Sequence, residues 1–323
     1  MTLLLCHDDV CDIVSMKDAI AVMESAFAEE AAGATILPQR INMSVSKGWL
    51  RVGPVALERS GVMGFKAMNL CPGVGVRYQV HLFAIESGEL LSIMDAQYLT
   101  TLRTGATSAV ATRRLARPGP ANVALLGSGA EARAQLEAMH AAGYVKSARV
   151  FSPTKANREK LAEDFRNAYG MAIEAADSAE DAVRGSDVVL AAVKANAPVL
   201  LGEWLKPGMH INSVGTARRD QREIDVAVFQ RSDRIVLDTR RGVLEEAGDA
   251  VAAREHIDDR RVKELCELVG GMAESRQSDQ EITLFKSVGT GIQDIALANA
   301  IFHRACERKV GIDFCSFPYA KKS

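Results

Sequence analysis

The sequence predicts an α/β fold with a doubly wound parallel sheet that begins near residue 118. Three observations predict it. The segment Arg117-Pro118-Gly119-Pro120 breaks the helical pattern of residues 104–116 and marks a domain boundary. After it, short apolar runs alternate with helical stretches, and a glycine-rich turn follows the first of these runs. This alternation is typical of βαβ units, whose strands are parallel.

The expected elements follow in order after the break. Strands are expected at residues 122–127, 148–152, 172–176, 187–193, 210–215 and 234–238. Helices are expected at residues 131–142 and 156–169. In such a sheet the ligand crevice lies at the carboxyl ends of the strands. The glycine turn follows the first strand and therefore lies where a ligand is expected.

The turn Gly127-Ser128-Gly129-Ala130-Glu131-Ala132 has the spacing of a dinucleotide-binding loop. Gly127 suits a tight turn, Gly129 permits close approach of a pyrophosphate, and the small Ala132 lets helix and strand pack closely. The helix N-terminus adds free amides and a positive dipole for the phosphates. The alternative is a structural strand-to-helix turn without a ligand.

The segment after the second strand bears on the choice of cofactor. Dinucleotide-binding domains often place a carboxylate there to bond the ribose of NAD, but this chain has Phe151-Ser152-Pro153-Thr154-Lys155, then Arg158. A carboxylate would repel a 2′-phosphate, whereas hydroxyls and a cation bind one, so NADP(H) is favoured over NAD(H). Alternatively, or in addition, Ser152 and Thr154 cap the helix that begins near residue 156.

Three cations before the break lie in apolar or glycine-rich surroundings. Arg40 follows Leu37-Pro38-Gln39, Lys66 interrupts the apolar residues 62–68, and Arg103 lies near the start of a helix. Desolvating a cation is unfavourable unless an anion meets it, so their convergence would indicate a substrate with a carboxylate. A guanidinium matches a carboxylate in geometry. Each cation taken alone is equally explained by snorkelling or by a salt bridge.

Composition narrows the classes of partner. The 323 residues, 48% hydrophobic and 25% charged, are enough for two domains with a substantial core. A net charge of -2 gives no reason to expect nucleic acid or an anionic membrane. There is no apolar run of the roughly 18 residues that a membrane span needs and no basic leader before His7, so we expect a cytoplasmic protein with a small-molecule partner.

No metal site or nucleophilic triad is expected. The six cysteines contain no CxxC pair and the six histidines are dispersed, so we expect buried free thiols and histidines without chemistry. The cysteines are Cys6, Cys11, Cys71, Cys266, Cys306 and Cys315. Glu245, Glu246 and Asp249, with the charges that follow at residues 254–261, are expected to form a solvated surface.

Taken together, these motifs resemble those of the ornithine cyclodeaminase/mu-crystallin family, whose members include alanine dehydrogenases, ketimine and pyrroline-carboxylate reductases and cyclodeaminases. The match is in order along nearly the whole chain. The matching segments are Gln39-Arg40, Gly64-Phe65-Lys66-Ala67-Met68-Asn69, residues 102–108 from Leu102 to Ser108, the glycine turn at 127–132, Asn212-Ser213-Val214-Gly215, Lys286-Ser287-Val288-Gly289 and Gln293-Asp294.

The resemblance implies how the domains are arranged. Residues 118–289 would form the Rossmann dinucleotide-binding domain, inserted in an α+β substrate-binding and dimerisation domain made of residues 1–117 and 290–323. The apolar pattern of residues 290–308 would be the helix that returns to this second domain. The resemblance also implies a homodimer.

The resemblance further implies roles for particular residues. Arg40, Lys66 and Arg103 would bind the substrate carboxylate, with Lys66 the catalytic group next to the reacting carbon or nitrogen and Arg103 also within reach of the cofactor; Val288 would touch the substrate. Cofactor contacts are implied for Gly127, Gly129, Ala130 and Glu131 at the pyrophosphate, Ser152, Thr154 and Arg158 at the adenosine ribose, and Val214, Gly215, Thr216 and Ser287 at the nicotinamide.

One departure from the family pattern affects the expected reaction. Cyclodeaminases carry an aspartate after the Val-Gly pair that resembles a proton shuttle, and Ala217 stands there in this chain. A methyl group moves no protons, so ornithine cyclisation is disfavoured. Mu-crystallin-type ketimine reductases also lack that aspartate, and they resemble this chain in having an arginine at the following position, which is Arg218 here.

We therefore expect an NAD(P)H-dependent reductase of a small 2-imino acid, such as 1-pyrroline-2-carboxylate or 1-piperideine-2-carboxylate, that yields the L-amino acid. The alternatives are an alanine-type amino acid dehydrogenase and a protein that binds NADPH and a small ligand without turnover.

Overall fold

The computed structural model describes residues 2–314, which divide into two compact units, Met1–Arg103 with Thr290–Ser323, and Thr104–Gly289. The division falls inside helix α3 (Gln97–Leu115), earlier than the boundary expected after residue 117. The cause is hydrogen bonding: Gln135 Nε2 donates to the carbonyl of Thr104 at 3.1 Å, and Asn212 Nδ2 donates to the hydroxyl of Thr112 at 2.8 Å. The second half of α3 therefore belongs to the second unit.

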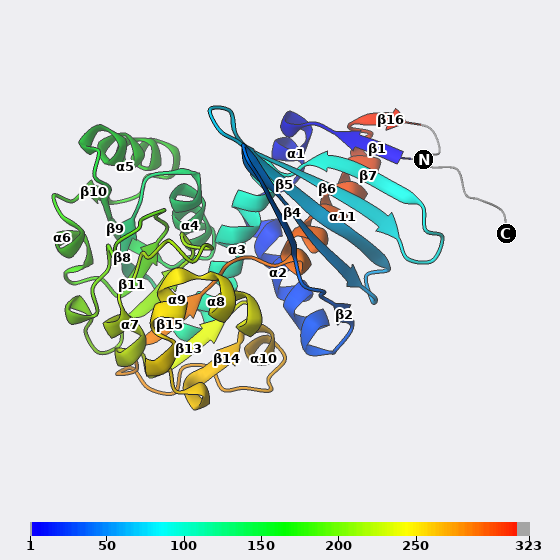
Figure 1. The fold of residues 1–323 in the computed structure, drawn as a ribbon. Coiled ribbons are helices and arrows are strands. Elements are labelled where there is room, and N and C mark those ends of the chain that lie inside the picture. The colour runs from blue at the N-terminus through cyan, green and yellow to red at the C-terminus, as the bar shows by residue number, and fades with distance from the viewer. Residues whose placement is uncertain (1, 315–323) are drawn as a thin grey trace. The chain divides into compact units, whose positions relative to one another are not determined.

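The first unit contains an eight-stranded sheet (Figure 1). Its order is β16-β1-β7-β6-β5-β4-β2, with β3 paired to β4, and its neighbours are antiparallel except for the parallel pair β1 and β7. The strands are β1 (Thr2–Leu5), β2 (Thr35–Ile36), β3 (Ile41–Val45), β4 (Gly48–Leu57), β5 (Val62–Cys71), β6 (Gly75–Ala84), β7 (Leu90–Asp95) and β16 (Ile312–Phe314).

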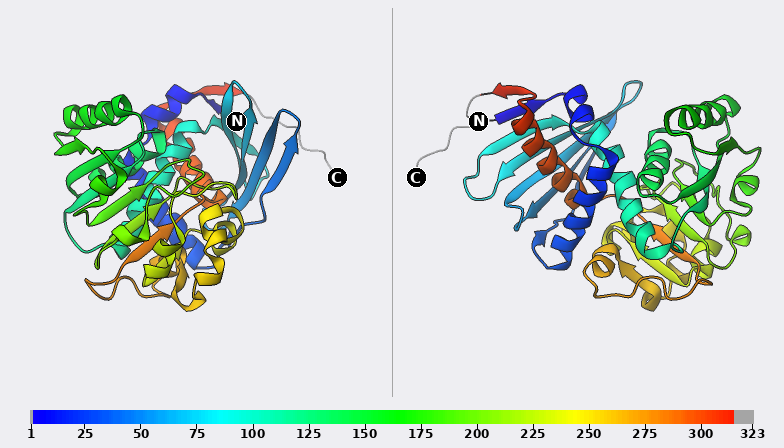
Figure 2. Two further views of the ribbon diagram at one scale, coloured as in Figure 1. Left: turned by 60° about the vertical axis from the view of Figure 1, so that its left-hand side comes forward. Right: turned by 180° about the vertical axis from the view of Figure 1, so that it is seen from behind.

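Helices of the first unit pack on one face of this sheet. They are α1 (His7–Ile13), α2 (Met16–Ala31) and α11 (Gly291–Arg308), and α11 packs against α2 and against β4, β5 and β6 (Figure 2). The expected returning helix at residues 290–308 is confirmed. Gly64 of β5 permits the close approach, since a Cβ there would lie 2.9 Å from Ile295 Cδ1. Side chains alternate along a strand, so Lys66 faces α11 as well.

The second unit contains an eight-stranded sheet in which every pair is parallel, in the order β10-β9-β8-β11-β12-β15-β13-β14. The chain runs outward from β8 to β10 and then returns to β11, so the switch point lies between β8 and β11 (Figure 1). The doubly wound parallel sheet predicted from the sequence is confirmed.

The elements of this unit match the six expected strands within a few residues. The strands are β8 (Ala121–Leu126), β9 (Val145–Phe151), β10 (Ile173–Ala175), β11 (Val188–Ala191), β12 (His210–Ser213), β13 (Arg234–Leu237), β14 (Val262–Glu264) and β15 (Thr283–Lys286). The helices are α4 (Ala130–Ala141), α5 (Lys155–Tyr169), α6 (Ala179–Val183), α7 (Val226–Arg231), α8 (Arg240–Glu246), α9 (Gly248–Ala252) and α10 (Leu265–Val269). Strands β14 and β15 were not predicted, because both contain a lysine that hides their strand pattern.

The cysteines differ from expectation in their burial. Cys266 is buried, but Cys6, Cys71 and Cys306 are exposed and Cys11 is intermediate; all five are free thiols. The prediction of buried thiols is therefore wrong for most of them, and Cys315 lies outside the described residues. None of the helices between residues 2 and 314 is both long and apolar enough to cross a membrane. Within the same range, no group of three or more His, Cys, Asp or Glu side chains is placed to hold a metal ion.

Candidate functional site

A buried cluster in the first unit joins β5, α3 and α11. Lys66 Nζ lies 2.8 Å from the Asp294 carboxylate and 3.3 Å from the hydroxyl of Thr100. Arg103 donates from Nε to Asp294 Oδ1 at 3.0 Å and from Nη1 to Gln293 Oε1 at 2.9 Å. The side chains of Lys66, Arg103 and Asp294 are each less than one-tenth exposed. The cluster therefore brings together two of the predicted cations around one carboxylate.

The third predicted cation lies close enough to act on this cluster. Arg40 is half-buried beside β4, where its Cγ lies 3.8 Å from the position of a Cβ added to Gly53. Its positive charge lowers the pKa of both Lys66 and Asp294. The ring centroid of Tyr78 lies 5.9 Å from Lys66 Nζ. Arg40 and Arg103 thus both act electrostatically on Lys66, and the contact of the three cations with a substrate carboxylate stays a prediction.

The charge balance of this cluster is positive, because three cations meet one carboxylate. Burial lowers the pKa of Lys66 to about 8, an effect that Asp294 opposes and Arg103 reinforces. Burial acts to raise the pKa of Asp294, but Lys66 and Arg103 outweigh it, so that pKa is lowered. Asp294 is therefore ionised, and it neutralises only part of the positive charge. The remaining charge suits an anionic ligand.

Asp294 and Gln293 are site residues that the residue-level analysis did not assign. Asp294 was present in the motif Gln293-Asp294 but carried no role, because its partner Lys66 stands 228 positions earlier in the chain. The salt-bridge explanation considered for each cation holds for Lys66 and Arg103, and it does not exclude a ligand because the positive excess remains.

The glycine turn of the second unit has the geometry that a dinucleotide requires. Gly127 has φ of +118°, and a Cβ there would lie 2.7 Å from the carbonyl oxygen of Ala192 and 3.3 Å from Ala132 Cβ. Gly129 is the N-cap of α4 without a side-chain cap, and a Cβ there would meet no atom within 4 Å. Gly129 and Ala130 are exposed at the start of α4, so the free amides of this helix N-terminus fit a pyrophosphate.

A buried arginine, Arg158, is hydrogen-bonded to the loop after β9. Arg158 is 8% exposed, donates from Nη1 to the carbonyl of Ser152 at 2.9 Å and lies 5.6 Å from the Phe151 ring centroid. Its Nη2 is 3.6 Å from the exposed carboxylate of Asp177. Thr154 is the N-cap of α5 but makes no side-chain capping bond, so the capping explanation is wrong for Thr154.

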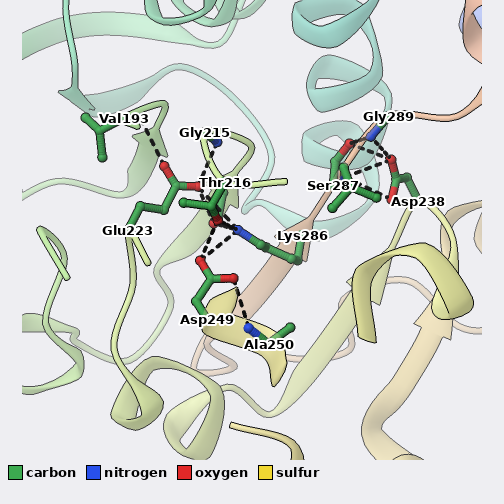
Figure 3. A network of polar contacts seen from close by, with 12 residues as sticks. Val193, Gly215, Thr216, Glu223, Asp238, Asp249, Ala250, Lys286, Ser287 and Gly289 are labelled. Carbon is green, nitrogen blue, oxygen red and sulfur yellow. Dashed lines mark hydrogen bonds and ion pairs between the residues drawn. The ribbon is translucent and has the colours of Figure 1, made fainter. Parts of the chain in front are cut away.

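The predicted nicotinamide loops meet at a buried lysine of β15. Lys286 Nζ lies 2.7 Å from the hydroxyl of Thr216, 2.8 Å from that of Ser213 and 2.8 Å from Asp249 Oδ2 (Figure 3). Asp249 is 1% exposed. The expectation that Asp249 lies on a solvated surface is therefore wrong, because its charge is matched by a lysine that the local sequence does not show.

Two further carboxylates bind the loops at the carboxyl edge of the sheet. Glu223 accepts from the backbone N–H groups of Val193 at 3.0 Å and Gly215 at 2.8 Å. Asp238 accepts from the hydroxyl of Ser287 at 2.6 Å and the N–H of Gly289 at 2.6 Å (Figure 3). Gly215 and Ser287, for which the resemblance implies contacts to the nicotinamide, both lie at this edge, and the acids that hold them were not predicted.

Val214 and Val288, for which ligand contacts were predicted, lie in the same loops. The N–H of Val214 donates to the carbonyl of Ala191 at 3.0 Å, and the N–H of Val288 donates to the Asp238 carboxylate at 3.1 Å. Val288 belongs to the second unit, unlike Arg40, Lys66 and Arg103, with which a substrate role was predicted for it.

A Rossmann-type unit whose glycine turn opens a helix is typical of enzymes that bind a dinucleotide cofactor. A model of the ornithine cyclodeaminase/mu-crystallin family matches residues 1–309, and the chain belongs to this family. The ketimine reductase mu-crystallin of Macropus fuliginosus is 31% identical over 285 residues, which cover 85% of this chain and 87% of that protein.

Two solved structures are similar over almost the whole chain. One is Thermococcus litoralis Δ(1)-pyrroline-2-carboxylate reductase in complex with NADH and L-proline, with a TM-score of 0.92, 35% identity and coverage of 97% of this chain and 100% of that one. The other is an archaeal alanine dehydrogenase dimer with bound NAD, with a TM-score of 0.91, 31% identity and coverage of 97% and 99%. The protein is accordingly an oxidoreductase that uses a nicotinamide cofactor.

Proposed function

We propose that the protein reduces a small 2-imino acid to the L-amino acid with NAD(P)H, with a cyclic ketimine such as 1-pyrroline-2-carboxylate or 1-piperideine-2-carboxylate as substrate. The observation that carries the proposal is the buried cluster of Lys66, Arg103 and Asp294, which keeps a positive excess and contains a lysine with a pKa of about 8. Similarity to a pyrroline-carboxylate reductase supports it.

The residues of the second unit fit the cofactor. The open first turn of α4 would bind the pyrophosphate, and Val214, Gly215, Thr216 and Ser287 would bind the nicotinamide half. When bound, the reduced nicotinamide supplies the hydride that the imine carbon accepts. The protein's own task is then to bind the acid, orient it and provide one proton.

In the first unit, the arginines would bind the substrate and Lys66 would act on it. Arg40 and Arg103 would bind the substrate carboxylate, since a guanidinium matches it in charge and geometry. The Arg103 guanidinium donates hydrogen bonds to Gln293 at 2.9 Å and to Asp294 at 3.0 Å, so its orientation is fixed before the substrate binds. Prepositioned charge of this kind favours the transition state without reorganisation.

Lys66 would supply the proton. Hydride addition to the imine carbon leaves a nitrogen that must gain one proton, and a lysine with a pKa of about 8 is both protonated near neutral pH and able to release its proton. Asp294, ionised and 2.8 Å from Nζ, keeps the ammonium in place. Lys66 then regains a proton from water.

The test is NAD(P)H oxidation, followed by absorbance, with purified protein and 1-pyrroline-2-carboxylate in ammonia-free buffer. Turnover is the expected result, since a preformed imine needs no ammonium. If oxidation occurs only with pyruvate and ammonium, the alanine dehydrogenase alternative, favoured by similarity to such an enzyme at a TM-score of 0.91, replaces the proposal. A tight NADPH complex without oxidation by any imino or keto acid would support a binding protein.

Ornithine cyclisation stays disfavoured. Ala217 cannot shuttle protons, and the nearest acid in sequence, Asp220, is bound by the Arg218 guanidinium at 2.8 and 3.0 Å. We expect no release of ammonia from L-ornithine in an assay of the purified protein.

We propose NADPH as the preferred cofactor. The loop after β9 offers Ser152, the exposed Thr154 and the cation Lys155, and no carboxylate, to the adenosine ribose. Arg158 contributes through the loop it braces. Comparison of kcat/KM for NADPH and NADH tests this preference, and a preference for NADH would contradict it.

We propose a homodimer. Ile41, Met43 and Val45 of β3 are each at least half exposed, and an apolar strand of this kind is unfavourable in water without a partner. The similar alanine dehydrogenase is described as a dimer. Size-exclusion chromatography with light scattering would reject the dimer if only monomer appeared.

A further inference from the structure

The network around Lys286 holds three ionisable side chains, Lys286, Asp249 and Glu223, each with no exposed side-chain surface. None of them takes part in the proton or carboxylate chemistry proposed above. Burying three such groups is unfavourable unless each is paired and hydrogen-bonded. The cost of burying these groups indicates that the network has a role, and its distances show which parts of the chain it holds together.

The distances distinguish the two carboxylates. Lys286 Nζ lies 2.8 Å from Asp249 Oδ2 but 3.4 Å from Glu223 Oε1. Asp249 Oδ2 also accepts from the hydroxyl of Thr216 at 2.8 Å, and its Oδ1 accepts from the N–H of Ala250 at 2.9 Å. Lys286 and Asp249 are thus the ion pair, and its nearest neighbour is the hydroxyl of Thr216 (Figure 3).

Glu223 is bonded mainly to uncharged groups. Its carboxyl group has the hydroxyl of Ser213 at 2.6 Å and the N–H groups of Gly215 and Val193 at 2.8 and 3.0 Å. Burial raises the pKa of Glu223, Lys286 opposes this shift and Asp249 reinforces it. Glu223 is therefore the more distant of the two acids from Lys286, and its main contacts are the donors of the loops rather than the lysine.

The network connects the loops at the carboxyl edge of the sheet. Glu223 bonds Val193, two residues after the end of β11, to Gly215 after β12, and the ion pair bonds Thr216 to the last residue of β15. Every connection thus ends on the segment Ser213–Thr216, which has no regular secondary structure after Ser213. This segment carries three of the residues proposed to meet the nicotinamide.

We propose that Lys286 and Asp249 are positioning residues for the cofactor, an ion pair that holds Thr216 and its loop in the conformation that binds the nicotinamide half, while Glu223 joins Gly215 to Val193 by hydrogen bonds. The inference rests on the proposed place of the nicotinamide against Val214, Gly215 and Thr216. It does not depend on which imino acid is the substrate.

The experiment measures the Kd of NADH and of NADPH directly, by the fluorescence of the reduced nicotinamide, so it needs no turnover. The variants are Lys286→Met, Asp249→Asn and Glu223→Gln. The matched control is Thr283→Val at the opposite end of the same strand, whose hydroxyl is equally buried and bonds the carbonyl of Leu115 at 2.8 Å. Thermal unfolding of each variant is measured alongside.

Asp249→Asn and Lys286→Met are expected to raise Kd about tenfold, while Thr283→Val lowers Tm and leaves Kd within about twofold. Glu223→Gln is expected to raise Kd less than Asp249→Asn does, because Glu223 is not the ion-pair partner of Lys286 and loses only one hydrogen-bond acceptor. If Lys286→Met changed Kd no more than Thr283→Val does, the positioning role would be refuted. If Glu223→Gln weakened binding more than Asp249→Asn, the ion pair would not be what holds the loop, and the proposal would be wrong.

A double variant covers the case in which Lys286→Met does not fold. Lys286→Met with Asp249→Leu removes both members of the pair, so neither is left as a buried charge without its partner. This variant is expected to fold and still to bind NADH about tenfold more weakly, because Thr216 has lost its anchor. A folded double variant with unchanged Kd would overturn the proposal. Activity on any imino acid is a separate measurement, so failure of the proposed reaction and failure of this inference are distinguishable.

Discussion

The two units each bury a lysine beside an aspartate and a threonine, yet the two clusters have opposite charge balance. In the first unit Lys66 and Asp294 are 2.8 Å apart with two arginines near them, so cations are in excess. In the second unit Lys286 and Asp249 are also 2.8 Å apart, but an additional carboxylate, Glu223, makes acids the excess.

The two excesses are resolved in different ways. A buried carboxylate can take up a proton, and burial raises the pKa of Glu223, which is a shift in that direction. An arginine cannot give up its proton, so in the first unit burial and the neighbouring Arg103 lower the pKa of Lys66 instead, and the proposed carboxylate of the substrate would meet the remaining positive charge. If both proposals hold, the comparison teaches that a buried network with excess acid holds loops, whereas one with excess cations binds a substrate.

The largest expected effect separates the two lysines. Lys66→Met should lower kcat/KM by about 10²–10⁴, because it removes the proton donor, and should leave the Kd of NADPH within about twofold. Lys286→Met serves as the contrast, since it is expected to weaken cofactor binding. Steady-state kinetics and a fluorescence titration of both variants test the pair. Wild-type activity in Lys66→Met would show that the assigned role is wrong.

The next largest effect is expected for Arg40, the half-buried arginine near the first cluster. Arg40→Leu should raise KM for the imino acid about 10- to 100-fold, because a charge-assisted contact to the carboxylate is lost. KM for NADPH should not change. Arg304→Leu is the control. Arg304 lies on α11, donates a hydrogen bond to Asp18 at 2.7 Å and carries no predicted ligand role. Equal KM values for the two variants would remove Arg40 from the substrate site.

The ionised aspartate of the first cluster should set the alkaline limb of activity. Lys66 acts while protonated, so kcat/KM of the wild type should fall as pH rises through about 8. Asp294 raises the pKa of Lys66, so Asp294→Asn should lower that pKa and move the limb to lower pH, with a loss of about tenfold in kcat at neutral pH. Asp18→Asn, at a half-buried aspartate paired with Arg304 away from the first cluster, should leave the limb in place. A limb unmoved in Asp294→Asn would mean that another group titrates.

The sequence predicted what depends on local pattern. Short apolar runs between helical stretches located six of the eight strands of the second unit, and this pattern failed at β15 because Lys286 is polar and yet fully buried. The dihedral and packing demands on Gly127 were predictable because they are properties of one turn.

Partners that are distant in sequence were not predictable from that pattern. Lys66 and Arg103 could be recognised as embedded cations, but Asp294, on a helix that returns at the end of the chain, could not be paired with them. Asp249 was placed on the surface for the same reason, since Lys286 lies 37 positions later. Charge in a sequence shows that a partner is required, and only the fold shows which residue it is.

The smallest expected effect lies in the loop after β9, where charges are exposed. Lys155→Glu should lower the ratio of kcat/KM for NADPH to that for NADH about two- to fivefold, because exposed charges interact weakly through solvent. Lys160→Glu on the same helix, whose lysine pairs with Asp164 at 3.2 Å, is the control and should leave the ratio unchanged. The effect of Lys155→Glu should shrink in high salt, as expected of an unburied charge. An unchanged ratio in low salt would place the 2′-phosphate away from Lys155, and the buried Ser152 would then have to carry the preference.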